Sequence, residues 1–232
     1  MSGAFFPVAT LATSLAAAAI IFLLPEGAFR ARTGLNLAAA VLKIGLVAWM
    51  VRGLSQGHAY AVEFPVLEGL AFVLRADPLG IMFAGLSSLL WLFTTIYAIG
   101  YLEDSPNRRR FFGFFSLCVA STLGISLAGN LFTFLIFYEL LTLSTYPLVA
   151  HRGTPKALAA ATLYLRFTLT AGLVLMIGMV ALHALAGDIR FGQREILAEF
   201  GPEQRGVLIA IFWVLIAGFG VKAGLVPLHG WL

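Results

Sequence analysis

The sequence predicts an all-α integral membrane protein with about seven transmembrane helices. Hydrophobic residues make up 60% of its 232 residues and charged residues only 11%, well below the roughly 25% charge of a typical soluble domain. The apolar runs are also close to the 20 or so residues that a helix needs to cross a bilayer. We predict spans over residues 4–24, 34–54, 79–101, 111–129, 131–149, 157–185 and 206–228.

The first span is predicted to be a retained helix rather than a signal peptide, because no basic segment precedes it and its apolar run is long. Gly129 and Asn130 favour a turn and therefore separate the fourth span from the fifth. If these two spans formed one long helix, the orientation of every later span would be reversed.

Two connecting segments have patterns of their own. Residues 55–78 are predicted to form a short strand pair outside the membrane. The residues that fit this prediction are Phe64-Pro65, residues 72–74 and Asp77-Pro78. In residues 186–205, Ile196, Leu197 and Phe200 fit a helical stripe in the plane of the membrane interface; an ordinary solvated loop fits equally well.

The distribution of basic residues predicts the orientation of the chain. The loops after spans one, three and five hold seven basic residues: Arg30, Arg32, Arg108, Arg109, Arg110, Arg152 and Lys156. The loops after spans two and six hold five, together with seven acidic residues. By the positive-inside rule the first set is cytoplasmic and the N-terminus lies outside. The net charge of +4 thus reflects topology, and we expect no nucleic-acid partner.

Four ionisable side chains lie inside predicted spans: Lys43, Glu139, Arg166 and Lys222. A charge at the centre of a bilayer costs roughly 2.5–3.5 kcal/mol on insertion scales, so such residues are rare unless they are paired, hydrated or used. In a chain this apolar they predict the movement of protons or ions.

Glu139 lies near the middle of its span, and Thr142 and Tyr146 follow on the same helical face. We interpret it as a carboxylate that tunes a partner cation. The alternative is a structural carboxylate, either neutral or bonded to a neighbouring helix.

Lys222 lies on a weakened helix, because Pro227 leaves a carbonyl without its hydrogen bond one turn back. Glycines at 218, 220 and 224 would let another helix approach closely. Since burial disfavours the charged form of lysine, a lysine with a mobile carboxylate partner is suited to loading and releasing a proton. The alternative is that Lys222 snorkels to the cytoplasmic face.

The remaining candidates carry weaker signals. His229 follows Lys222 by seven residues and would share its face if the helix continued, so it is either a proton relay or an ordinary satisfied polar group. Arg166, between Thr162 and Thr170, is predicted to pair with a carboxylate, because arginine stays protonated. For Lys43 no partner is evident, and a role as a charge partner or in the structure fits as well as transport.

Several site classes are excluded or unsupported. The single cysteine, Cys118, cannot form an internal disulfide or hold an iron–sulfur cluster alone. A bis-histidine haem would need two of His58, His151 and His183 to face each other at one depth. No nucleotide-binding or catalytic-triad pattern is present, so we expect no cofactor and no metal.

Two motifs resemble those of a known family. Residues 137–149 (FYELLTLSTYPLV) are similar to the fifth-helix signature of the antiporter-like subunits of respiratory complex I, membrane-bound hydrogenases and Mrp-type cation/proton antiporters. Residues 221–232 (VKAGLVPLHGWL) resemble the broken seventh helix of these subunits. Residues 77–79 and 110–112, where spans three and four begin, also resemble the corresponding positions of the family. Within the family the sequence most resembles the D component of Mrp-type Na⁺/H⁺ antiporters.

The resemblance implies that Glu139 and Lys222 form the glutamate–lysine pair of the family. It also implies that the cytoplasmic half-channel approaches Lys222 and that His229 lines the route. The complete family fold has about fourteen helices with two inverted five-helix repeats. Residues 1–232 would then be a single membrane domain, in which 1–110 hold the peripheral helices and 111–232 begin the first repeat.

The sequence departs from the family pattern in two places. The sixth helix of the family often carries a lysine where this chain has Leu163, and Arg166 lies nearly one turn later. The chain also stops before the first repeat is complete, which fits one half of a split subunit, a truncated product or the ordered part of a longer gene. For a split subunit, we expect another chain to supply the further C-terminal helices.

The sequence therefore predicts a proton-translocating subunit or half subunit of a larger complex in the bacterial cytoplasmic membrane, with Na⁺ as a candidate coupled ion. The complex could be an ion-translocating oxidoreductase. Two alternatives remain open: a non-conducting structural or assembly subunit, and a redox subunit that binds quinone or haem.

Overall fold

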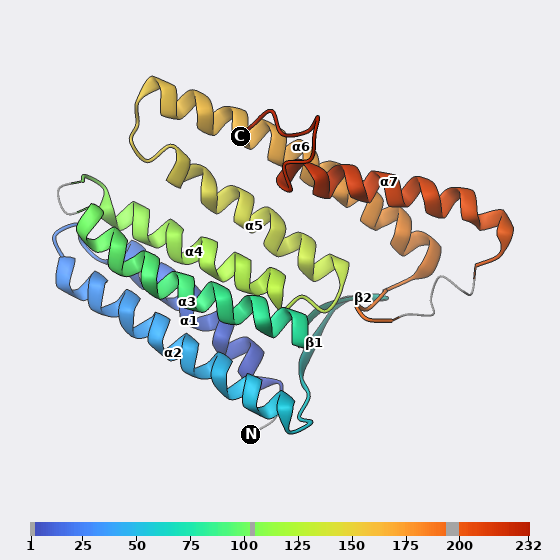
Figure 1. The fold of residues 1–232 in the computed structure, drawn as a ribbon, viewed down its shortest axis with the longest axis horizontal. Coiled ribbons are helices and arrows are strands. Elements are labelled where there is room, and N and C mark those ends of the chain that lie inside the picture. Colours follow the sequence, from blue (N-terminus) through green and yellow to red (C-terminus); the bar gives the residue numbers. More distant parts are fainter. Residues whose placement is uncertain (1–2, 103–104, 194–199) are drawn as a thin grey trace. The chain divides into compact units, whose positions relative to one another are not determined.

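The computed structural model describes residues 3–102, 105–193 and 200–232, and the chain divides into two compact units. The first unit consists of residues 1–63 and 73–128, and the second of residues 64–72 and 129–232. In the described part of the chain, seven α-helices are joined by loops, a 3-10 turn and one β-hairpin (Figure 1).

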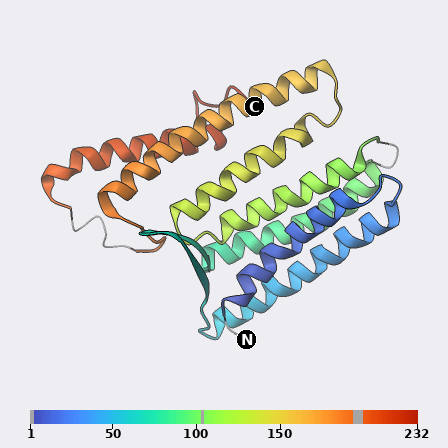
Figure 2. The ribbon, with the colours of Figure 1, turned by 180° about the vertical axis from the view of Figure 1, so that it is seen from behind.

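The first unit is a bundle of four helices, α1 (Phe5–Leu23), α2 (Phe29–Ser55), α3 (Pro78–Tyr101) and α4 (Arg108–Ser126). Helix α1 packs against α2 and α4, and α3 packs against the same two helices, as the ribbon also shows from behind in Figure 2. Alanines, Trp91 and Val119 fill part of the interior. Helix α3 begins where predicted, because the Asp77 carboxylate accepts a hydrogen bond from the Gly80 amide and Pro78 occupies the first turn.

The second unit contains α5 (Leu131–Val149), α6 (Pro155–Ala186), the 3-10 turn η2 (Pro202–Gln204) and α7 (Arg205–Lys222). Helix α6 packs against both α5 and α7, and the long α6–α7 contact is plain in Figure 1. The stripe predicted at Ile196 and Leu197 falls on residues 194–199, outside the described residues.

Six of the helices are long and apolar enough to cross a membrane: α1, α2, α3, α5, α6 and α7. Helix α4 has three arginines in its first turn, Arg108–Arg110, which lower its mean hydropathy, but its 19 residues are also close to a membrane-spanning length. Large apolar side chains such as Trp49, Phe93 and Trp213 are exposed, as expected of surfaces that face lipid. The chain is a multi-pass membrane protein.

The hairpin predicted in residues 55–78 is confirmed. Strand β1 (Tyr60–Leu67) pairs with β2 (Leu70–Ala76), and the turn between them contains Gly69 with φ +73°, a backbone conformation that glycine adopts without steric cost. The all-α description therefore holds for the membrane-spanning part, with one small sheet added.

The boundaries of the last helix differ from the prediction. Helix α7 ends at Lys222, six residues before the predicted end of the seventh span. Gly224 has φ +68°, and the backbone from Ala223 to Leu232 forms turns. Since Pro227 cannot donate a backbone hydrogen bond, it does not support a continuous helix. The motif at 221–232 thus places its lysine at a helix end.

The alternative of one long helix through Gly129 and Asn130 is excluded. Helix α4 ends at Ser126 and α5 starts at Leu131, where the Asn130 side chain caps the helix by accepting a hydrogen bond from the Thr133 amide.

Candidate functional site

The side chain of Lys222 points from the end of α7 onto α5. Its Nζ donates a hydrogen bond to the carbonyl oxygen of Tyr138 at 2.7 Å, and lies 3.5 Å from the centre of the Tyr138 ring. The lysine is half-buried. These contacts direct the ammonium group toward the helix that carries Glu139, which argues against snorkelling to the membrane surface.

Tyr138 is the residue that organises this contact. It is 4% exposed, and its hydroxyl donates to the Gly218 carbonyl oxygen at 3.2 Å. Its own carbonyl oxygen also accepts a hydrogen bond from the hydroxyl of Thr142 at 3.1 Å. Tyr138 therefore contacts α7 at two points, and it supplies both an oxygen ligand and an aromatic face to Lys222, which is favourable for a cation.

Glu139 lies against the third helix of the unit, α6. Its carboxylate occupies the space beside Gly172, where any side chain would collide with it. Its Oε1 atom is buried and has no hydrogen-bond partner among the described residues. A buried, unpartnered carboxylate oxygen is costly and is a group for which a functional explanation is warranted.

Glu139 and Lys222 interact electrostatically, but within the described residues their side chains form no ion pair. Lys222 instead contacts the residue next to Glu139 on the same helix. The second unit thus holds one acidic and one basic side chain that interact electrostatically without a direct ion pair among the described residues. Such an arrangement is suited to a proton or cation that is bound in one state and released in another.

The other predicted site residues lie elsewhere. His229 is exposed and belongs to the turns after α7, so it does not share a helical face with Lys222. Arg166 is exposed on α6, in a groove with Thr170 and Val221. Lys43 belongs to the first unit, where it is fully buried.

The comparisons with known proteins point to one family. A family model described as "NADH:quinone oxidoreductase/Mrp antiporter, TM" matches residues 128–232, which include the whole site. A second, "NADH-Ubiquinone oxidoreductase (complex I), chain 5 N-terminus", matches residues 69–112. The chain belongs to the antiporter-like subunit family.

Two relatives illustrate the breadth of this family. The chain is 32% identical over 200 residues to the N subunit of NADH-quinone oxidoreductase from Desulforudis audaxviator, a match that covers 84% of this chain and 39% of the relative. It is 27% identical over 161 residues to the D subunit of the Na(+)/H(+) antiporter from Bacillus subtilis, covering 69% of this chain and 32% of the relative. The chain thus spans less than half the length of these antiporter-like subunits.

A solved structure shares the fold. A chain of the membrane-bound sulfane sulfur reductase, an archaeal respiratory membrane complex, superposes with a TM-score of 0.83 at 16% identity. The match covers 97% of this chain and 46% of that one. At this identity the likeness concerns the fold alone.

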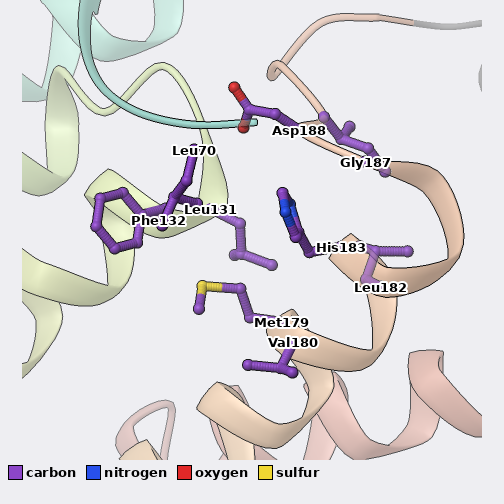
Figure 3. Close-up of a pocket in the computed structure, with 10 residues that line it drawn as sticks. Leu70, Leu131, Phe132, Met179, Val180, Leu182, His183, Gly187 and Asp188 are labelled. Atoms are coloured by element: carbon purple, nitrogen blue, oxygen red, sulfur yellow. The ribbon is translucent and has the colours of Figure 1, made fainter. Parts of the chain in front are cut away.

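The antiporter-like chain has another pocket, shown in Figure 3, near the start of α5 and the end of α6. Its volume is about 130 Å³, and its lining is mostly apolar, with His183 and Asp188 as polar members. Asp188 is already engaged by Asn130 and Arg190. Small-molecule sites usually measure about 300–1,000 Å³, so this pocket gives no support to a quinone site.

The histidines do not support the haem alternative either. His151 and His183 lie near opposite ends of α6, which at 32 residues is roughly 48 Å long. Among the described residues, no group of three or more His, Cys, Asp or Glu side chains could hold a metal ion.

Proposed function

We propose that this chain moves protons as part of an antiporter-like subunit in a larger membrane complex, with Glu139 and Lys222 as the working pair. The observation that carries the proposal is the hydrogen bond from Lys222 to the Tyr138 carbonyl oxygen, which brings an ammonium group from α7 next to an intramembrane carboxylate on α5. The family of the chain is consistent with this role.

In this mechanism Lys222 alternates between a protonated and a neutral state. The Tyr138 carbonyl and ring, together with the negative charge of Glu139, stabilise the ammonium form. The carbonyl end of the α7 dipole also favours a positive charge at its last residue. When a nearby charge draws Glu139 away, the ammonium ion loses part of this stabilisation and passes its proton on.

The remaining candidates take supporting roles. His229 is exposed beyond the end of α7, and its proposed role is to relay the proton between Lys222 and water on the cytoplasmic side. Arg166 is exposed on α6 and can pair with a carboxylate of another subunit. Lys43 stands apart from this site in the first unit.

We expect further membrane subunits as partners, including one that contributes additional C-terminal helices. Helix α7 provides apolar surface for such contacts through aromatic residues such as Phe212 and Trp213, which are 53% and 63% exposed. The proposed location is the bacterial cytoplasmic membrane, with the N-terminus outside.

The test is substitution of Lys222 in the intact complex. Lys222→Ala should lower coupled proton transport in inverted membrane vesicles by about tenfold or more, while the complex still assembles, as judged by co-purification. Lys222→Arg should also impair transport, since arginine keeps its charge but does not release a proton. Lys156→Ala is the matched control, because Lys156 is an exposed lysine at the start of α6. Unchanged transport in Lys222→Ala, with normal assembly, would overturn the proposal.

One observation favours the alternative of a non-conducting subunit. Leu163 occupies the position where the family often has a lysine, and it is 42% exposed, so α6 offers no proton carrier there. A non-conducting subunit would keep full transport in Lys222→Ala but lose it when assembly is disrupted. The same experiment therefore separates the two functions.

A further inference from the structure

The first unit holds a buried amine that the proposed function does not use. Lys43 lies in the middle of α2, which runs over 27 residues, and its exposed fraction is zero. Helix α2 extends roughly 18 Å or more from Lys43 in each direction. The amine of Lys43 therefore lies too deep to reach either end of the bundle. An uncompensated ammonium ion at this depth is costly.

The immediate surroundings of Lys43 are polar but uncharged. Its Nζ donates a hydrogen bond to the Ser14 hydroxyl of α1 at 2.7 Å, and lies 4.4 Å from the centre of the Trp91 ring of α3. The hydroxyl can accept from an ammonium ion and can either accept from or donate to a neutral amine. The site is therefore able to hold Lys43 in both protonation states.

No carboxylate is available on the four helices of this bundle, because none of α1–α4 contains an Asp or Glu. The charged and titratable groups are Arg30, Arg32 and Arg52 on α2, Tyr97 and Tyr101 on α3, and Cys118 and Arg108–Arg110 on α4. Tyr97 and Tyr101 are 67% and 61% exposed, and the arginines lie near the helix ends. Lys43 thus differs from Lys222, whose helix bundle contains Glu139.

Further buried polar groups extend from Lys43 toward one end of the bundle. Asn36 is fully buried on the same face of α2, and the Ser116 hydroxyl of α4 donates to its side-chain oxygen at 3.0 Å. Arg32, one turn further, is 1% exposed. Its Nε and Nη2 atoms have no hydrogen-bond partner in the described residues. From Arg32 to Lys43 the helix rises roughly 16 Å, about half of the 30 Å apolar layer.

Polar groups also extend from Lys43 toward the other end. Below Ser14 on α1, the buried Thr10 hydroxyl donates to the Phe6 carbonyl oxygen at 2.7 Å. Phe6 lines a pocket of about 460 Å³ together with Arg52 and His58. The Nε1 atom of Trp91, beside Lys43, and the Oγ1 atom of Thr95, one turn later on α3 and so toward the Arg32 end, are buried without a partner among the described residues. Such groups in protein interiors are commonly satisfied by water.

We propose that Lys43 is a second proton-binding site, built inside the α1–α4 bundle and separate from the Glu139–Lys222 pair. Its ligand is a proton, delivered by water along the buried polar groups of α1 and α2. In the charged state the ammonium ion is held by the Ser14 hydroxyl and the Trp91 ring. On release of the proton to water, the neutral amine stays hydrogen-bonded to Ser14 and the bundle loses its uncompensated charge.

The chain has three lysines, Lys43, Lys156 and Lys222, which makes a direct test practical. The full chain, labelled with ¹⁵N at lysine Nζ and reconstituted in lipid bilayers, gives three resonances by solid-state NMR. Lysine-to-arginine variants at the three positions assign them, so that Lys43 can be identified by elimination if Lys43→Arg does not fold. The ¹⁵N shift distinguishes an ammonium ion from an amine.

The expected result is a reversible change of Lys43 from ammonium to amine between about pH 6 and about pH 9, with the resonance of the exposed Lys156 recorded in the same spectra as a reference. Ser14→Ala should move the midpoint by about one pH unit, whereas Ser55→Ala, an exposed serine on α2, should leave it unchanged. A Lys43 ammonium ion that persists across this pH range, or an amine at every pH, overturns the proposal. Lys222 reports in the same spectra, so a failure at Lys43 is distinguishable from a failure of the Glu139–Lys222 mechanism.

Discussion

At the scale of single residues, the site depends on the absence of a side chain at Gly172. The Glu139 carboxylate fills the space beside this glycine on α6. The carboxylate is the flexible end of its side chain, so an added methyl group would displace it rather than separate the helices. The position of Gly172 therefore controls where the negative charge lies.

We predict that Gly172→Ala lowers coupled transport by about tenfold without preventing assembly, because it moves the Glu139 carboxylate from its place. Transport in inverted vesicles and co-purification measure the two effects. Gly206→Ala on α7 is the control, since nothing lies within 4 Å of a methyl group there. In a Glu139→Gln background the Gly172 change should add little, because the two substitutions act on one contact. Full transport in Gly172→Ala would show that the carboxylate position is unimportant.

The sequence allowed Glu139 and Lys222 to be predicted as site residues, since a charge in an apolar run is conspicuous. It did not single out Tyr138 or Gly172. Tyr138 acts through its backbone carbonyl oxygen, which every residue has, and through a ring that in an apolar helix is ordinary. Gly172 contributes only space. The residue type of neither position marks it as part of a site in the sequence. Both positions were therefore identified only from their contacts in the structure.

At the scale of elements, Asn130 ties three segments of the second unit together. Its side-chain oxygen caps α5, and its amide nitrogen donates to the Ala71 carbonyl oxygen at 2.8 Å and to Asp188 at 3.0 Å. The residue is fully buried. It therefore links the start of α5 to the hairpin strand β2 and to the loop after α6.

We predict that Asn130→Ala lowers the free energy of unfolding by about 2–3 kcal/mol, because it removes a helix cap and leaves buried groups without partners. Thr154→Ala is the matched control. It removes only the exposed cap of α6 and should cost about 1 kcal/mol. Thermal or denaturant unfolding in detergent, followed by circular dichroism, compares the two. Equal losses would mean that the contacts with Ala71 and Asp188 contribute nothing.

At the scale of the whole molecule, the loops after α1 and α3 meet at one end of the first unit. The Glu26 carboxylate accepts a hydrogen bond from the Arg109 amide at 3.2 Å, and its carbonyl oxygen accepts one from Arg32 at 3.1 Å. The positive-inside rule predicts that both loops are cytoplasmic. Their contact agrees with an assignment of both loops to the same side of the membrane.

We predict that the α1–α2 loop is cytoplasmic and the end of α2 is outside. In a Cys118→Ala background, Gly27→Cys should react with a membrane-impermeant maleimide in inverted vesicles but not in intact cells. Ser55→Cys should show the opposite pattern. Both positions are exposed. The reverse labelling would invert the orientation and place the Lys222 end of α7 outside.

The sequence by itself determined the class of the protein, the number and approximate bounds of its helices, its hairpin and its family. Composition, run length and short motifs are local properties, so they can be read along the chain. The partners of the buried charges were decided by tertiary structure: Lys43 contacts a residue 29 positions away and Lys222 one 84 positions away. Because lipid-facing and interior surfaces are both apolar, hydrophobic periodicity does not show which faces of these helices meet.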